Sequence, residues 1–337
     1  MPLAATLLMK FRAYLRATKF ILGSFNANPK PAPALKREST PGGTAFDRYI
    51  PAGEPIRTVI VIYGIALAGE QDLRAIRIGS LLANLGVEAI VPVLPGLKSY
   101  AATVGDYELL VDLISYLHTL SGKPLGMLAS SLGGGIGLAV TADARVADML
   151  DLAVLFSPYY ELPDVAAALR AMMLKTPQTT QEWDDFTWSM MVAAYRNLNK
   201  LDFSVEEIEQ LKEYLWNSFS KPLQPRLDYY ERVLKNRDLF ADEDLRVPEE
   251  VREMLSPRGK IGHVKARVVV LHDTHDQLIL PLEAEKILAE LSQRPHPHQQ
   301  EILVTPWLNH VTPRLSREML DIFMIVGMMA KLFIKNG

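Results

Sequence analysis

The chain has 337 residues, of which 49% are hydrophobic and 22% charged, so it can bury a large core. It contains no cysteine, which excludes disulfides, cysteine nucleophiles, iron–sulfur clusters and Cys-ligated zinc. The net charge of -3 is unevenly spread, because residues 1–37 carry seven bases and no acid. The rest of the chain is acidic, which disfavours nucleic acid as its partner. The basic segment 1–37 suits an anionic membrane surface or an acidic partner protein.

Residues 1–25 predict an amphipathic helix, because large apolar residues recur at helical spacing and basic residues flank them. The apolar positions are Leu7, Leu8, Phe11, Tyr14, Leu15 and Leu22, and the bases are Lys10, Arg12, Arg16 and Lys19. Such a helix packs on its own body, on a second subunit of a homodimer, or on a membrane surface as a peripheral anchor. No uncharged apolar run reaches about 18 residues, and the order of charges is not that of a secretory signal. We therefore expect a cytoplasmic protein, and peripheral membrane contact through residues 1–25 stays open.

The rest of the chain predicts an α/β fold with a mostly parallel, doubly wound sheet. Short apolar runs, rich in β-branched residues, alternate with segments of helical spacing. The runs are residues 58–64, 87–93, 125–130, 152–158, 266–273 and 301–306, and a weaker extended piece covers 45–50. The predicted organisation is an N-terminal arm and Pro-rich linker (1–43), one core (44–158 and 264–337) and a helical insertion (159–263).

A serine stands where a buried strand must turn sharply into a helix, in the segment 126–137. Ser131 has a small residue two positions before it, Ala129, and another two positions after it, Gly133. A turn of this kind raises the serine hydroxyl above the carboxyl edge of the sheet and directs the amide of Leu132 at the same space. Ser130 is the competing nucleophile, although Gly133 then stands at the wrong offset.

This segment resembles the nucleophile elbow of the α/β-hydrolase family, whose pattern is G-x-S-x-G, with alanine in the first small position here. The resemblance covers residues from about 45 to the C-terminus. It implies a triad in the order Ser131, Asp276, His310, in which the imidazole activates the serine and the carboxylate orients the imidazole. Asp276 and His310 each follow a predicted strand, and Asp273 is the alternative acid.

The family's second oxyanion donor comes from the loop after the first strong strand, where this chain reads YGIALAG over residues 63–69. Tyr63 stands where the family has histidine, so the amide of Ile65 is the first candidate and that of Ala66 the second. The crowded group His272, Asp273, His275 and Asp276 could instead hold a metal, but the acid turn of the fold accounts for it, and we expect no metal and no cofactor.

The insertion is rich in aromatic residues and methionine and resembles the lid of capped α/β-hydrolases. Trp183 and Trp188, with Tyr63 and Ser130 from the core, are the candidate substrate-binding residues. The predicted activity is that of a serine hydrolase, carboxylesterase- or lipase-like, which cleaves a small ester with a hydrophobic moiety through an acyl-enzyme. The open alternatives are an acyltransferase or thioesterase on the same scaffold, and a non-catalytic protein that binds a ligand or docks on a membrane.

Overall fold

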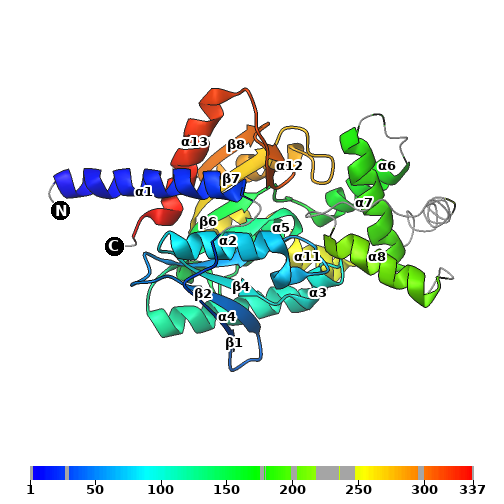
Figure 1. Cartoon of the computed structure of the whole chain (residues 1–337), viewed down its shortest axis with the longest axis horizontal. Helices are drawn as coiled ribbons and strands as arrows, with labels where there is room; N and C mark the ends of the chain where they lie inside the picture. The colour runs from blue at the N-terminus through cyan, green and yellow to red at the C-terminus, as the bar shows by residue number, and fades with distance from the viewer. Residues whose placement is uncertain are drawn as a thin grey trace.

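The computed structural model describes residues 3–26, 30–174, 178, 180–198, 203–217, 235, 247–294 and 300–335. At its centre is an eight-stranded sheet in the order β1-β2-β4-β3-β5-β6-β7-β8 (Figure 1). The strands are β1 (Ala34–Ser39), β2 (Ala45–Ile50), β3 (Thr58–Ile62), β4 (Glu88–Pro92), β5 (Leu125–Ser130), β6 (Leu150–Phe156), β7 (Arg267–Asp273) and β8 (Gln300–Thr305). From β4 to β8 all neighbours are parallel, and β1 and β2 add antiparallel pairs at one edge.

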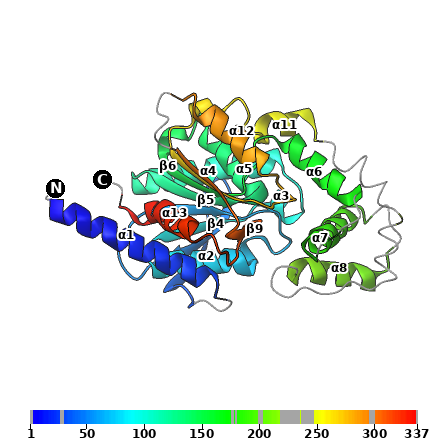
Figure 2. The same cartoon turned by 90° about the horizontal axis from the view of Figure 1, so that it is seen from above.

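The central strands are buried along nearly their whole length, because helices cover both faces of the sheet. On one face lie α2 (Leu73–Asn84) and α13 (Met319–Met329), with α1 (Leu3–Ser24) packed outside them (Figure 2). On the other lie α4 (Val104–Ser121), α5 (Ser131–Thr141) and α12 (Leu282–Leu291). The predicted α/β class with a mostly parallel sheet is thereby confirmed, and each predicted apolar run lies within two residues of an observed strand.

The N-terminal arm differs from its prediction in one respect: the expected linker contains strand β1. This strand pairs with β2 in antiparallel register, and Arg37 reaches Asp47 across the pair. Its side chains are mostly exposed, so the segment lacks the alternation of apolar and polar residues that marks a half-buried strand. Backbone pairing at the sheet edge therefore holds a segment whose composition indicates a linker.

Helix α1 is present as predicted, but small residues make its main contact with the body. Ala13, Ala17 and Phe20 are buried against α13 and the short 3-10 helix η5 (Ala330–Phe333), where the Phe20 and Phe333 rings lie 6.1 Å apart. The large apolar side chains on its predicted apolar side are exposed, namely Leu7, Leu8, Phe11, Tyr14, Leu15 and Leu22. Within the described residues, none of the helices has the length and apolar character needed to cross a membrane.

The insertion begins with α6 (Leu162–Leu174), α7 (Thr180–Arg196) and α8 (Val205–Asn217), which lie together beyond one end of the sheet (Figures 1 and 2). Their buried residues form a second hydrophobic cluster around Phe186, Met190 and Met191, and Tyr100 joins it from the loop after α3 (Pro95–Lys98). The returning segment differs from the predicted boundary at residue 263. Helix α11 (Glu249–Leu255) already packs on α4 and α5 and belongs to the core.

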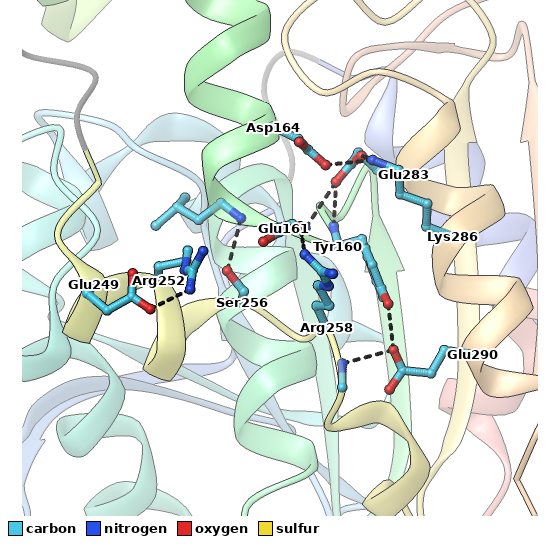
Figure 3. A network of polar contacts seen from close by, with 12 residues as sticks. Tyr160, Glu161, Asp164, Glu249, Arg252, Ser256, Arg258, Glu283, Lys286 and Glu290 are labelled. Atoms are coloured by element: carbon cyan, nitrogen blue, oxygen red, sulfur yellow. Dashed lines mark hydrogen bonds and ion pairs between the residues drawn. The ribbon is translucent and has the colours of Figure 1, made fainter.

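Carboxylates of α12 hold the start of the insertion and the segment that follows α11 (Figure 3). The buried Glu283 accepts hydrogen bonds from the amides of Tyr160 and Glu161 at 2.9 and 3.1 Å, at the point where the chain leaves the core. Glu290 accepts from the Tyr160 hydroxyl at 2.8 Å, and also from the amides of Gly259 and Ile261 on the returning segment. The start of the insertion is therefore tied to the core by charge-assisted hydrogen bonds.

Candidate active site

Ser131 lies at the sharp turn between β5 and α5 and has the left-handed φ of +55°. A non-glycine residue in this region is strained, and such strain is stored at functional sites. The turn needs small neighbours: a Cβ at Gly133 would lie 2.1 Å from the Tyr63 carbonyl oxygen, and one at Gly64 would lie 2.9 Å from Ser131 Cβ. Both glycines let the backbone of the β3 end pass directly beside the serine.

Alanine at the first small position of the elbow is accommodated by a glycine on the next helix. Ala129 is fully buried, and a Cβ added at Gly137 of α5 would lie 3.2 Å from Ala129 Cβ. The methyl group of Ala129 on β5 therefore occupies space that is free because Gly137 on α5 has no side chain. The departure from G-x-S-x-G leaves the packing of β5 on α5 intact.

The three predicted triad residues come together at the carboxyl edge of the sheet. His310 Nε2 lies 2.8 Å from Ser131 Oγ, and His310 Nδ1 lies 2.7 Å from Asp276 Oδ2. The other oxygen of Asp276 accepts hydrogen bonds from the amides of Leu278 and Ile279 at 3.0 and 2.9 Å. The carboxylate can only accept, so Nδ1 carries a proton and Nε2 is free to accept one from the serine hydroxyl.

His310 has a φ of +54° in the turn between the two-residue strands β9 (Leu308–Asn309) and β10 (Thr312–Pro313), and two side chains fix its backbone. Asp273 Oδ2 accepts a hydrogen bond from the His310 amide at 2.8 Å, and Ser157 Oγ donates one to the His310 carbonyl at 2.9 Å. Asp273, the alternative acid, thus contacts the histidine backbone, and Asp276 contacts the ring. Ser157 was not predicted, because a serine just past the end of β6 carries no motif of its own.

The electrostatics of the relay favour charge separation between His310 and Asp276. Burial lowers the pKa of His310, but the Asp276 charge and its hydrogen bond outweigh burial, so the pKa lies above its ordinary value. Burial raises the pKa of Asp276, yet His310 and the backbone amide of Ile279 hold it below its ordinary value. The site is therefore built to stabilise an imidazolium beside a carboxylate, the state that forms when the histidine takes the serine proton.

His272 lies beside the relay without joining it. Its ring is fully buried, Nε2 donates to the Ile279 carbonyl at 2.9 Å and lies 3.8 Å from Asp276 Oδ2, and burial lowers its pKa. His272 is consequently neutral and packs behind the acid. Across the described part of the chain, no cluster of three or more histidine, aspartate or glutamate side chains could hold a metal ion.

Of the two candidate loop amides for the oxyanion hole, Ile65 and Ala66, one already donates a hydrogen bond within the protein. The Ala66 amide donates to the Leu97 carbonyl at 3.1 Å, whereas the Ile65 amide has no backbone or side-chain acceptor among the described residues. The Leu132 amide stands in the first turn of α5, where helix amides have no partner within the helix. The Ile65 and Leu132 residues line the same cavity as Ser131.

A mostly apolar cavity of about 330 Å³ adjoins Ser131 and His310. Of the predicted substrate-binding residues, Tyr63, Ser130 and Trp188 line it. Trp183 does not line it: its side chain is 45% exposed and packs edge-on against Phe186, so its part in substrate binding stays a prediction. Trp183 and Trp188 are five positions apart on α7, so their side chains point in directions about 140° apart around the helix axis.

Comparison with known proteins identifies the fold. No family model and no curated protein matches the sequence, but many solved structures match the chain in three dimensions. A proline iminopeptidase of Mycobacterium smegmatis has a TM-score of 0.51 at 14% identity and covers 89% of this chain and 99% of its own. An α/β hydrolase superfamily protein of Enterococcus faecalis has a TM-score of 0.51 at 13% identity, and the match covers 90% of this chain and 99% of that protein. The esterase PF2001 of Pyrococcus furiosus has a TM-score of 0.52 at 13% identity, and the match covers 89% of this chain and 91% of the esterase. The chain has the α/β-hydrolase fold.

Proposed function

We propose that the protein is a serine hydrolase that cleaves carboxylic esters with a hydrophobic acyl or alcohol moiety through an acyl-enzyme. The observation that carries this proposal is the continuous relay from Asp276 through His310 to Ser131, with both links within hydrogen-bond distance. A serine hydroxyl is a weak nucleophile until a neutral imidazole accepts its proton. Here that imidazole has the required tautomer and an adjacent carboxylate.

The reaction follows from the geometry of the relay. Ser131 Oγ attacks the ester carbonyl carbon while His310 Nε2 takes the hydroxyl proton, and Asp276 stabilises the imidazolium. The amides of Leu132 and Ile65 donate to the oxyanion that develops on the carbonyl oxygen. His310 then gives its proton to the departing alcohol, and a water molecule repeats the sequence on the acyl-enzyme to release the acid.

The cavity supports a hydrophobic substrate. Apolar side chains dominate its lining, among them Leu132, Val165, Leu169 and Ile279, and Trp188 extends it into the cap. A lining of this kind binds an acyl chain through burial of apolar surface, whereas the polar groups near Ser131 orient the ester. The similar fold of the esterase among the compared proteins is compatible with this choice.

The test is labelling with a fluorophosphonate probe, which reacts only with an activated serine. We expect the wild type and Ser130→Ala to be labelled, Ser131→Ala to be unlabelled, and the adduct to lie on the peptide that contains residue 131. A series of p-nitrophenyl esters and thioesters of increasing chain length, with and without alcohol acceptors, then defines the reaction. No labelling of the wild type beside a reactive control hydrolase, or labelling that survives in Ser131→Ala, contradicts the proposal.

A further inference from the structure

The outer sides of α1 and α13 carry large apolar side chains in solvent. Phe11 is 61% exposed on α1, and Leu320 and Phe323 are 80% and 71% exposed on α13. We call this surface the α1–α13 face, and its members are Leu7, Leu8, Phe11, Tyr14, Leu15, Leu22, Met319, Leu320, Phe323 and Met324. A soluble monomer rarely leaves so many large apolar side chains exposed together.

The exposed apolar side chains of α1 and those of α13 form one surface, because they meet where the two helices are in contact. Leu320, Phe323, Met324 and Gly327 recur at helical spacing on one side of α13. A Cβ at Gly327 would lie 3.5 Å from the Tyr14 hydroxyl oxygen, so the stripe on α13 continues directly into that on α1. The first half of α1 projects past the rest of the molecule, and its exposed side chains are therefore accessible (Figures 1 and 2).

The charges beside this face are mostly positive. Helix α1 carries Lys10, Arg12, Arg16 and Lys19 and no acid, and none of the four forms an ion pair within the part of the chain that is described. At the start of α13, Arg314 and Arg317 are exposed, and the acids are Glu318 and Asp321, of which Asp321 accepts a hydrogen bond from the Thr305 hydroxyl. The face is thus an apolar stripe flanked by cations, and those of α1 have no ion-pair partner among the residues that the structure describes.

We propose that the α1–α13 face docks on an anionic lipid bilayer. Apolar side chains on such a helix enter the boundary between headgroups and acyl chains, and lysine and arginine pair with anionic headgroups. A second copy of the chain fits less well, because a two-fold interface uses the same patch on both copies and so gathers two sets of four α1 cations into one interface. Charge complementarity therefore selects the lipid surface.

The cavity beside Ser131 reaches the inner sides of the same two helices. Phe20, Ile21 and Phe25 of the α1 segment line it, and so do Ile322, Ile325 and Met329 of α13. An acyl chain that leaves the bilayer between these helices can therefore follow apolar side chains to the serine. On this basis, and resting on the proposed hydrolase activity, the substrate class is a long-chain ester dissolved in the membrane.

Sedimentation with vesicles tests the docking without any need for activity. We expect binding to vesicles of phosphatidylcholine mixed with phosphatidylglycerol, and much weaker binding to phosphatidylcholine alone. The double variant K10Q/R12Q should bind the mixed vesicles about 30-fold more weakly, because each base near an anionic membrane contributes roughly a fivefold gain in binding. Its matched control is K123Q/R267Q, which removes the same charge from exposed positions elsewhere and should bind like the wild type.

Apolar contacts are tested by Phe11→Ser and Phe323→Ser, with Leu120→Ser as control at an exposed position on α4, across the sheet. Each face variant should lose about tenfold or more in vesicle binding, and the control should lose none. Failure of the wild type to bind mixed vesicles, or equal losses in face and control variants, overturns the docking. A stable dimer that Phe11→Ser dissociates, with no vesicle binding, assigns the face to a second copy.

A comparison of two substrates separates this inference from the proposed function. A short soluble ester should be cleaved equally by the wild type and the face variants, whereas a long-chain ester in mixed vesicles should be cleaved more slowly by the variants. If the wild type cleaves neither ester, the proposed function fails, and the sedimentation result still decides the docking. If variants that no longer bind vesicles cleave the embedded ester as fast as the wild type, delivery from the bilayer is refuted.

Discussion

Asp276→Asn changes one atom of the relay and should reverse the tautomer of His310. The oxygen that accepts the amides of Leu278 and Ile279 must stay in place, since an NH₂ group there would face two donors. The NH₂ group therefore faces His310 Nδ1, 2.7 Å away, and requires that nitrogen to be an acceptor. The ring proton then moves to Nε2, opposite the Ser131 hydroxyl, where no proton can be accepted. We expect kcat to fall roughly 10⁴-fold.

The pH profile provides a second readout of the same change. The activity needs neutral His310, so kcat/KM of the wild type should fall as the pH drops through a pKa above the ordinary value of 6.5. In Asp276→Asn the burial that lowers this pKa persists without the opposing charge, so the acid limb should move to lower pH. The assay is hydrolysis of a short p-nitrophenyl ester across a pH series, with the folded state checked by circular dichroism.

Asp273→Asn is the matched control, because Asp273 is also a buried carboxylate near His310 but contacts only its backbone amide. This variant should weaken the position of the turn and cost far less, roughly 10- to 100-fold in kcat, with the acid limb closer to that of the wild type. A loss in Asp273→Asn equal to or larger than that in Asp276→Asn, or activity of Asp276→Asn within tenfold of the wild type, refutes the assignment of the acid.

Three further variants test the packing around the site. Gly133→Ala places a methyl group against the Tyr63 carbonyl oxygen and should lower the free energy of unfolding by about 1–3 kcal/mol in urea titration, together with kcat. Glu283→Gln removes the charge that holds the start of the cap and should cost about 1–3 kcal/mol, measured as a lower Tm than that of the exposed control Glu285→Gln. Trp188→Ala should raise KM for long-chain esters roughly tenfold, whereas Trp183→Ala should not; equal effects would contradict the different positions of the two rings.

The sheet was predictable where strands are buried on both faces and unpredictable where they are not. Continuous β-branched runs such as residues 58–64 and 266–273 have no polar face to obscure them, so their positions follow from the sequence. Strand β1 is held by pairing with β2, and β9 and β10 contain two residues each, so their own composition carries no signal. The packed side of α1 did not follow from its large apolar residues, because Ala13, Ala17 and Phe20 pack on the body while most of the other large apolar residues face solvent.

The meeting of Ser131, Asp276 and His310 was predictable because these residues follow strands whose carboxyl ends meet at one edge of a parallel sheet. The residues that position it were not, since they act through the backbone of a distant turn. Ser157 contacts the carbonyl of a residue 153 positions away, and the role of Asp273 depends on which of its neighbours the turn presents. These contacts become visible only when the register of β6, β7 and the β9–β10 turn is known.

The departures from the family pattern bear on whether the site is a catalyst or a remnant that only binds. The methyl group of Ala129 fits beside Gly137, which has no side chain. Tyr63 stands in place of the usual histidine, and its hydroxyl accepts a hydrogen bond from the Leu94 amide at 2.9 Å. Its carbonyl lies close to Gly133. Asp273, the alternative acid of the sequence analysis, accepts a hydrogen bond from the His310 amide. A site that had lost its chemistry would have no reason to keep a strained serine aligned with an imidazole and a buried carboxylate, at a cost of order 1–3 kcal/mol for each strained residue. Each departure instead makes a contact that supports the elbow or the histidine turn, and this favours the catalyst.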